Sequence, residues 1–184
     1  MSVCQLRMYI DGEAVSDYSG QSVSMNGDGD RVAIGAYLND GTASSAGHVR
    51  IYNLKVAADV TAPFITSVSS TTANGSYNAG DVIAITVTFS ENVTVSGAPQ
   101  LSLETGSSDA VVNYSSGSGG TALTFNYTVP SGQTSSDLDY KATNSLALNS
   151  GTIRDGAGNN ATLNIASPGS TNSLGANKAL GIHK

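Results

Sequence analysis

The sequence predicts an all-β protein, and three observations carry this prediction. Apolar residues recur at every second position through most of the chain, as in antiparallel strands that bury one face. Glycine, Asn, Asp and Ser separate these stretches about every 8–12 residues, which is the spacing of an antiparallel β-sandwich. Charged residues make up only 12% of the chain, whereas Gly, Ser, Thr and Asn, which are poor helix formers, are abundant.

Charge and cysteine content exclude several classes of function. The 184 residues carry a net charge of −6, which argues against nucleic acid or an anionic membrane as partner, because both attract clustered Lys and Arg. An acidic surface suits metal cations better. The single cysteine, Cys4, forms no intramolecular disulfide. No apolar run approaches the roughly 20 residues that span a bilayer, so we expect no membrane insertion. The first residues also lack a signal-peptide pattern, so the chain is either cytosolic or a piece of a larger protein.

Residues 1–57 are predicted to form a four-stranded meander. The strands are expected at residues 4–10, 21–25, 31–37 and 48–54. Clusters of Gly, Asp, Asn and Ser stand between them as turns. A poorly patterned stretch follows, and Pro63 disfavours a helix or a central strand there. We therefore predict a linker at residues 58–62 and a second domain at residues 63–184.

The second domain is predicted to be the sandwich. Its strands are expected at residues 64–70, 80–90, 93–97, 99–106, 110–119, 122–130, 145–153 and 161–167. The one helical-looking stretch, residues 135–148, is too short and too broken by Thr to predict a helix. Alternation is clearest in two strands, which we expect to lie opposite each other as the lining of a two-layered shell. Their inward residues are Ile83, Ile85, Val87 and Phe89 in the first, and Leu123, Phe125, Tyr127 and Val129 in the second.

Residues 61–183 resemble a bacterial immunoglobulin-like repeat of large cell-surface proteins, of the group named for a swimming-motility protein (the SWM repeat). The motifs that carry the resemblance are "TAPFITSVSS", "YNAGDVIAITVTFSENVTVSGAPQLSLETG", "YSSGSGGTALTFNYTV", "LALNSGTIRDGAGNNATL" and "GANKALGI". The resemblance implies an immunoglobulin-like sandwich of seven or eight strands, tandem neighbours in giant adhesins, and no catalysis.

Residues 5–55 resemble an FG-GAP-type β-propeller repeat. The order of "SGQSVSMNGDGDRVAIGA", a loop and "GHVRIY" carries this resemblance. A propeller closes a ring of about four to eight blades, whereas this chain has one repeat. We therefore interpret the chain as a fragment with neighbouring repeats in a parent chain, or as a subunit that pairs with copies of itself through exposed strand edges.

The acidic, glycine-rich stretch at residues 26–30 has two open interpretations. Asn26, Asp28 and Asp30 place oxygen ligands at alternate positions, as a calcium loop does. It is, however, one carboxylate short of the Asp-x-Asp-x-Asp-Gly loop of integrin-type propeller repeats. The other interpretation is a tight hairpin turn that uses Gly at positive φ. A phosphate cradle is excluded, since two carboxylates would repel phosphate and no helix follows.

A second candidate calcium site involves the linker and the end loops of the sandwich. In related adhesin repeats calcium is bound at the domain junctions, and that resemblance points here to Asp59, Glu91, Asp155 and Asn159. The alternative is a turn in which short acids and amides bond their own backbone. Calcium would rigidify the module, with an affinity on the order of 10⁻⁴–10⁻³ M.

Catalysis has little support. A hydrolytic triad needs a His between a nucleophile and an acid, but His48 begins a predicted strand and His183 lies near the C-terminus, while Cys4 suits a core position better than a nucleophile. We therefore expect a non-enzymatic structural or adhesion module of a large secreted or cell-surface protein. The alternative is a carbohydrate-binding module that uses Tyr side chains and the long loops, with Tyr37 as the residue to test.

Overall fold

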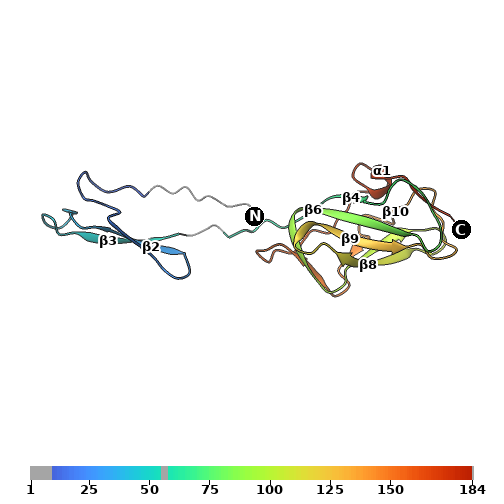
Figure 1. The fold of residues 1–184 in the computed structure, drawn as a ribbon, viewed down its shortest axis with the longest axis horizontal. Helices are drawn as coiled ribbons and strands as arrows, with labels where there is room; N and C mark the ends of the chain where they lie inside the picture. The colour runs from blue at the N-terminus through green and yellow to red at the C-terminus, as the bar shows by residue number, and fades with distance from the viewer. Residues whose placement is uncertain (1–9, 55–57, 184) are drawn as a thin grey trace. The chain divides into compact units, whose positions relative to one another are not determined.

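The computed structural model describes residues 10–54 and 58–183. The chain divides into two compact units, Met1–Ala58 and Asp59–Lys184. We call the first the N-terminal unit and the second the sandwich, and we describe each by itself (Figure 1).

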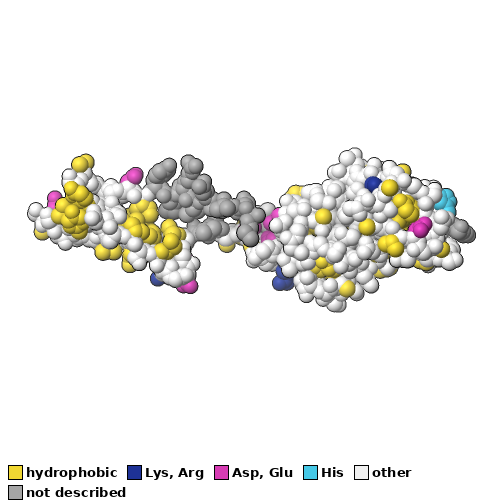
Figure 2. Space-filling view, in the orientation of Figure 1, with side chains coloured by type: hydrophobic (Ala, Val, Ile, Leu, Met, Phe, Trp, Pro, Cys, Tyr) yellow, Lys and Arg dark blue, Asp and Glu magenta, His cyan; other side chains and the backbone are white. Residues whose placement is uncertain are grey.

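The N-terminal unit is a three-stranded antiparallel sheet. Its strands β1 (Ser22–Met25), β2 (Arg31–Ala36) and β3 (His48–Asn53) lie in sequence order. The first predicted strand, residues 4–10, lies outside the described residues except for Ile10, which is not in a strand. Within residues 10–54 only Val32 and Ala36 are buried hydrophobic residues. Hydrophobic side chains accordingly gather on the surface of this unit (Figure 2).

The sandwich contains ten strands and one short helix within residues 58–183. Its antiparallel sheet runs in the order β10-β7-β8-β9-β6-β12, with β4 paired to β6 and β11 paired to β7. The all-β, antiparallel prediction is thus confirmed. The elements of this sheet are β4 (Ile65–Ser70), β6 (Val82–Ser96), β7 (Gln100–Glu104), β8 (Ala110–Ser116), β9 (Gly120–Thr128), β10 (Asp139–Tyr140), β11 (Leu146–Ala147) and β12 (Thr152–Arg154).

Strand β8 connects the two layers of the sandwich. Its first residues pair with β7, from Ala110 opposite Leu103 to Asn113 opposite Gln100. From Tyr114 onward it pairs with β9, with a shift of register between Tyr114 and Ser116. The hydrogen-bonded sheet therefore folds over itself, and side chains from β6, β7, β8 and β9 share one hydrophobic core.

The two strongly alternating segments line this core, but as neighbours in one layer. The alternate residues Ile83 to Phe89 and Leu123 to Val129 are all no more than 2% exposed. The register places Ile83 opposite Tyr127 and Ile85 opposite Phe125 on adjacent strands β6 and β9. They thus face each other along one sheet, not across two layers, because an antiparallel pair puts directly opposed side chains on the same face.

Several local features differ from the sequence prediction. Residues 145–153, expected as one strand, contain β11 and most of β12, separated by residues 148–151. Residues 82–96 form the single strand β6 with a register shift between Thr88 and Val93, where two strands were expected. Residues 161–167 form only an isolated bridge at Thr162. Near the C-terminus, the four-residue helix α1 (Leu174–Asn177) precedes β13 (Leu180–Ile182), which pairs in parallel with β5 (Gly75–Tyr77). Among the described residues, no helix is long and apolar enough to cross a membrane.

Candidate metal site and neighbouring features

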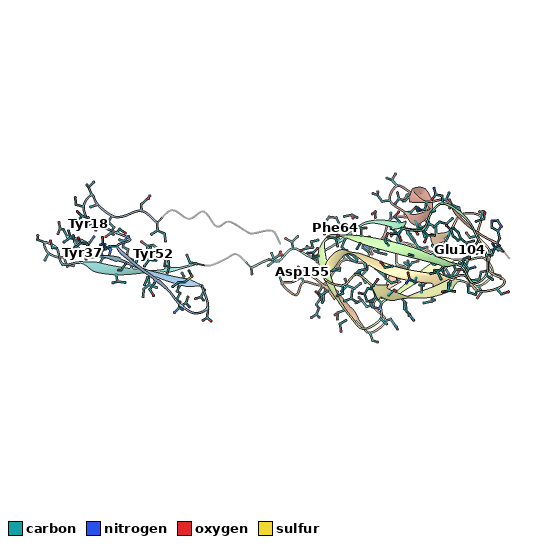
Figure 3. All side chains as sticks on the ribbon, in the orientation of Figure 1. Tyr18, Tyr37, Tyr52, Phe64, Glu104 and Asp155 are labelled. Atoms are coloured by element: carbon teal, nitrogen blue, oxygen red, sulfur yellow. The ribbon has the colours of Figure 1, made fainter. Side chains whose placement is uncertain are left out.

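Three carboxylates meet at the end of the sandwich where the chain enters it. Asp59 precedes β4, Glu91 lies within β6, and Asp155 follows β12. Each offers one carboxylate oxygen, and these oxygens all lie within 4.8 Å of one another. The side chain of Asp155 marks this end of the sandwich in Figure 3, with Glu104 at the opposite end. The sequence analysis names all three residues, although they are up to 96 positions apart (155 − 59).

The loop after β12 holds Asp155 in place. Its Oδ1 accepts hydrogen bonds from the backbone N–H groups of Ala157, at 2.9 Å, and Asn159, at 2.8 Å. The Asn159 side chain donates from Nδ2 to Asp155 Oδ2, at 2.7 Å, and to the carbonyls of Asp59, at 3.1 Å, and Thr61, at 3.3 Å. Asn159 thus links this loop to the entering segment through its amide N–H₂.

The carboxylates of the cluster repel one another, and this repulsion acts on Glu91. Desolvation by burial, followed by the nearby charges of Asp59 and Asp155, raises the pKa of Glu91 above its usual value. Burial would also raise the pKa of Asp155. The hydrogen bonds from the Asn159 side chain and from the backbone N–H groups of the loop outweigh burial, however, and lower that pKa. Asp155 is therefore held ionised, and a divalent cation would relieve the repulsion that Glu91 experiences.

The donor set fits calcium. Each of the three carboxylates offers one oxygen to the cluster, and calcium takes six to eight oxygen ligands, backbone carbonyls and water included, at about 2.3–2.6 Å in flexible geometry. The set contains no Cys or His, which zinc prefers. In a calcium-bound form, Asp59, Glu91 and Asp155 would be the protein ligands, with Asn159 orienting Asp155.

The stretch at residues 26–30 forms the turn between β1 and β2. Asn26 Oδ1 accepts from the backbone N–H groups of Asp30, at 3.1 Å, and Arg31, at 2.9 Å, while its Nδ2 donates to Asp30 Oδ1, at 2.7 Å. Gly29 has a φ of 71° and closes the turn by donating to the Asn26 carbonyl. Asn26 Oδ1 and Asp30 Oδ1 are thus used within the turn, and calcium binding by Asn26, Asp28 and Asp30 stays a prediction.

His48 lies beside a carboxylate but not beside a nucleophile. Its Nδ1 is 3.6 Å from Glu13 Oε2, and Arg50 also pairs with Glu13. Ser22 lines the same hollow as His48. However, Ser22 is opposite Gly35 and His48 is opposite Ala36, so the two side chains leave opposite faces of the sheet. No hydrogen bond joins Ser22 to His48 in the described part of the chain. Cys4 lies outside the described residues.

The sequence analysis missed a pair of aromatic rings in the N-terminal unit. The rings of Tyr18 and Tyr37 lie with centroids 5.5 Å apart at an interplanar angle of 36° (Figure 3). Both side chains are about half exposed. Tyr37 borders an open hollow of about 640 Å³, which Gln21 and His48 also line. No local pattern marks this pair, because the two residues are joined only by the fold of the meander.

Comparison with known proteins assigns the sandwich to a family. The family model described as a bacterial Ig-like domain matches residues 59–169, which is more than half of the 184 residues. This match confirms the immunoglobulin-like resemblance of the second domain, and it does not reach the FG-GAP-like residues. No curated protein and no solved structure matches the chain. Bacterial Ig-like domains are in general non-enzymatic structural modules and occur in cell-surface proteins. The chain belongs to the bacterial Ig-like domain family.

Proposed function

We propose that the chain is a non-enzymatic spacer or adhesion module of a large secreted or cell-surface protein. The observation that carries this proposal is that the sandwich is entered and left at opposite ends. Asp59 enters beside Glu91 on β6. Near the C-terminus, the His183 N–H bonds the carbonyl of Tyr77, which precedes the start of β6 at Val82. At about 3.3 Å per residue, the nine steps from Val82 to Glu91 separate these ends by roughly 30 Å.

A module with this geometry extends a chain of domains, because each copy adds its full length to the reach of the parent protein. The location is tested by labelling intact cells of the source organism with an antibody raised against residues 59–184. Surface labelling that is lost on mild external proteolysis supports the proposal. Labelling that requires lysed cells contradicts it.

Calcium at Asp59, Glu91 and Asp155 is the second part of the proposal. The ion would join the segment that enters the sandwich to β6 and to the loop after β12, and so would stiffen the junction with whatever precedes it. Because a ligand that binds only the folded state raises its stability, the melting temperature of the sandwich should rise between EDTA and millimolar calcium. Equal melting temperatures in the two buffers would remove calcium from the proposal.

The N-terminal unit is proposed to act as one FG-GAP-like blade. The support is its strand order and the apolar residues that it exposes on both faces. Val23 and Met25 lie on one face, and Val49 and Ile51 on the other; all four are at least 60% exposed. We propose that neighbouring repeats of the parent chain, or a second copy, cover these faces. A concentration-dependent mass in analytical ultracentrifugation that Ile51→Lys abolishes supports pairing of copies, whereas a monomer at all concentrations leaves only neighbouring repeats.

Carbohydrate binding remains the alternative function, and the Tyr18–Tyr37 pair is the observation that favours it. Exposed aromatic faces beside polar groups are suited to the apolar faces and hydroxyl groups of sugars. Glycan-array binding that is lost in Tyr37→Ala and kept in Tyr52→Ala, which changes a Tyr outside the pair, would establish it. Binding that both variants retain would exclude this surface.

A further inference from the structure

The last strand of the sandwich, β13, pairs with β5, near the start of the sandwich, and the two strands run parallel. Strand β13 runs parallel to β5, with Leu180 opposite Gly75 and Ile182 opposite Tyr77. Every other pairing between named strands of the described residues is antiparallel. The hydrogen bonds at the ends of this pair run from Gly75 N to the Ala179 carbonyl, at 3.0 Å, and from His183 N to the Tyr77 carbonyl, at 2.9 Å.

The preceding residues extend this connection along the sandwich. Val68 on β4 donates its N–H to the Asn172 carbonyl, at 2.9 Å, and accepts at its own carbonyl from Asn177 Nδ2, at 2.8 Å. Ala179 N donates to Asn74 Oδ1, at 3.2 Å. Residues 172–183 are therefore joined to residues 68–77 at successive points along their length.

The other edge of β13 is also fixed. Ile182 N donates to the Ser135 carbonyl, at 2.7 Å, and the Leu180 carbonyl accepts from Leu138 N, at 2.8 Å. The side chains of Leu180 and Ile182 are buried in the core. The strand that leaves the sandwich is thus held from both edges and from its apolar side.

The direction of the two strands decides how they respond to tension. A pull on the segment at Asp59 draws β4 and β5 toward the end of the sandwich where the chain enters. A pull beyond His183 draws β13 toward the opposite end, where the C-terminus lies (Figure 1). In a parallel pair loaded in this way the strands must slide past each other, so the hydrogen bonds between them bear the load together. Strands pulled apart from one end would lose the same bonds one after another.

We propose that the β5–β13 pair, with the contacts of residues 172–179, is a mechanical clamp against tension along the sandwich. This inference deepens the proposed spacer function, since a spacer under flow or adhesion carries such a load. Its test uses the isolated chain and is independent of where the protein resides. If the clamp is found but the protein is not at the cell surface, only the proposed spacer function is refuted. If the protein is at the cell surface but has no clamp, only this inference is refuted.

The test is single-molecule force spectroscopy of the full chain in two pulling geometries. Both chains carry one handle at the C-terminal end and have Cys4→Ser, which removes the native thiol. The second handle is attached at Val60→Cys, where the chain enters, or at Ala79→Cys, in the turn after β5. The first geometry slides β13 along β5, and the second peels the two strands from one end. We expect a clearly higher unfolding force in the first geometry. Equal forces, or the reverse order, would overturn the proposal.

Two matched variants in the Val60→Cys geometry test the strand pair itself. The backbone groups of Ala179 and His183, two positions before and after Gly181, form hydrogen bonds with β5. Because every second residue of a strand faces the same edge, the N–H of Gly181 also points toward β5. Gly181→Pro removes this donor and is expected to lower the unfolding force toward the peeling value. Val112→Ala truncates a core side chain on β8, outside the clamp, and is expected to lower the melting temperature with little change in force. If the force falls in both variants in proportion to stability, the clamp is refuted. The comparison of the two geometries decides the question even if Gly181→Pro does not fold.

Discussion

Folding changes the charge state of Glu91 through burial and through the charges of Asp59 and Asp155. Its pKa in the folded state is raised, so folding favours its protonated form, and the stability that it contributes is lost as the pH rises through that value. Above that pKa the ionised side chain therefore destabilises the sandwich. We predict that Glu91→Gln raises the melting temperature in EDTA and reduces the rise that calcium produces.

The matched control for this prediction is Glu104→Gln. Glu104 is exposed and lies at the other end of the sandwich (Figure 3), where it accepts a hydrogen bond from Gly106 N, at 3.3 Å. Glu104→Gln should leave the rise in melting temperature that calcium produces unchanged. If Glu91→Gln and Glu104→Gln behave alike in both buffers, Glu91 is not a calcium ligand.

Tyr140 makes the stability of the sandwich depend on alkaline pH. Its hydroxyl donates to the Ala166 carbonyl, at 2.6 Å, and its ring is buried. Burial, with a smaller effect of Asp139, raises the pKa of Tyr140 to about 12. Since an unfolded Tyr ionises near 10, the stability from this group is fully present below about pH 10 and is lost as the pH rises toward 12.

We therefore predict that Tyr140→Phe costs about 1–3 kcal/mol at pH 7, because the Ala166 carbonyl loses its partner. The variant should also lose less stability than the native chain between pH 10 and 12. Urea unfolding at pH 7, 10 and 12 measures these changes in stability, with Tyr52→Phe in the N-terminal unit as the control. An equally steep alkaline loss in Tyr140→Phe would contradict it.

At the scale of elements, the turn between β8 and β9 connects to the irregular part of β6. Gly119 N donates to the Val93 carbonyl, at 2.8 Å, and Ser118 Oγ accepts from Val95 N, at 2.9 Å. Gly117 and Gly119 both have positive φ, at 108° and 89°. A Cβ on Gly117 would lie 2.1 Å from the Ala122 carbonyl oxygen, whereas a Cβ on Gly119 would meet nothing within 4 Å.

Replacing a glycine at positive φ can cost stability in two ways, through an unfavourable backbone conformation and through a steric clash of the added methyl group. The two glycines separate these costs. Gly119→Ala should lose only the conformational preference for positive φ, about 1–2 kcal/mol. Gly117→Ala should lose clearly more, since backbone atoms must move to admit the methyl group. Urea unfolding of the two variants gives the comparison. Equal losses would mean that the turn relaxes freely and does not fix β8 and β9 to β6.

The strands and their pairing also show how much of the fold can be predicted from the sequence. Strands such as β6 and β9 are predictable because alternation records which side chains meet the core. The sequence does not predict the pairing of β13 with β5, which joins residues about 105 positions apart (180 − 75) through backbone groups that leave no side-chain pattern. Nor does it predict that β8 serves both layers, because the change of partner at Tyr114 depends on the positions of β7 and β9.

The candidate metal site shows the same limit. Asp59, Glu91 and Asp155 are named from the sequence because the resemblance to adhesin repeats implies calcium at the domain junction, bound by linker and end-loop acids. Their mutual distance within 4.8 Å follows from the fold. That Asn159 is a calcium ligand stays a prediction, and its observed hydrogen bonds depend on the fold in a similar way. Its amide N–H₂ is directed by two carbonyls of the segment that enters the sandwich, and these cannot be located from the loop sequence.

At the scale of the whole molecule, the two units differ sharply in how they are stabilised. The sandwich buries large side chains such as Phe125, Leu101 and Leu103 completely. Within residues 10–54, the buried polar residues Asp17 and Asn39, joined at 2.8 Å, match the buried hydrophobic residues Val32 and Ala36 in number. Since burial of apolar surface is the main driving force of folding, most of the stability resides in the sandwich.

Hydrogen exchange of the full chain should therefore show two separate levels of protection. Backbone N–H groups of β6 and β9 should exchange only through global unfolding of the sandwich, whereas those of β1, β2 and β3 should exchange through low-energy opening. Calcium bound at Asp59, Glu91 and Asp155 should slow exchange around Asp59 and in β12, whereas slower exchange in β1 and β2 would indicate binding at residues 26–30. If instead β1–β3 are protected as strongly as β9 in dilute monomeric protein, their exposed apolar faces need no partner, and the proposal that neighbouring repeats or a second copy cover them fails.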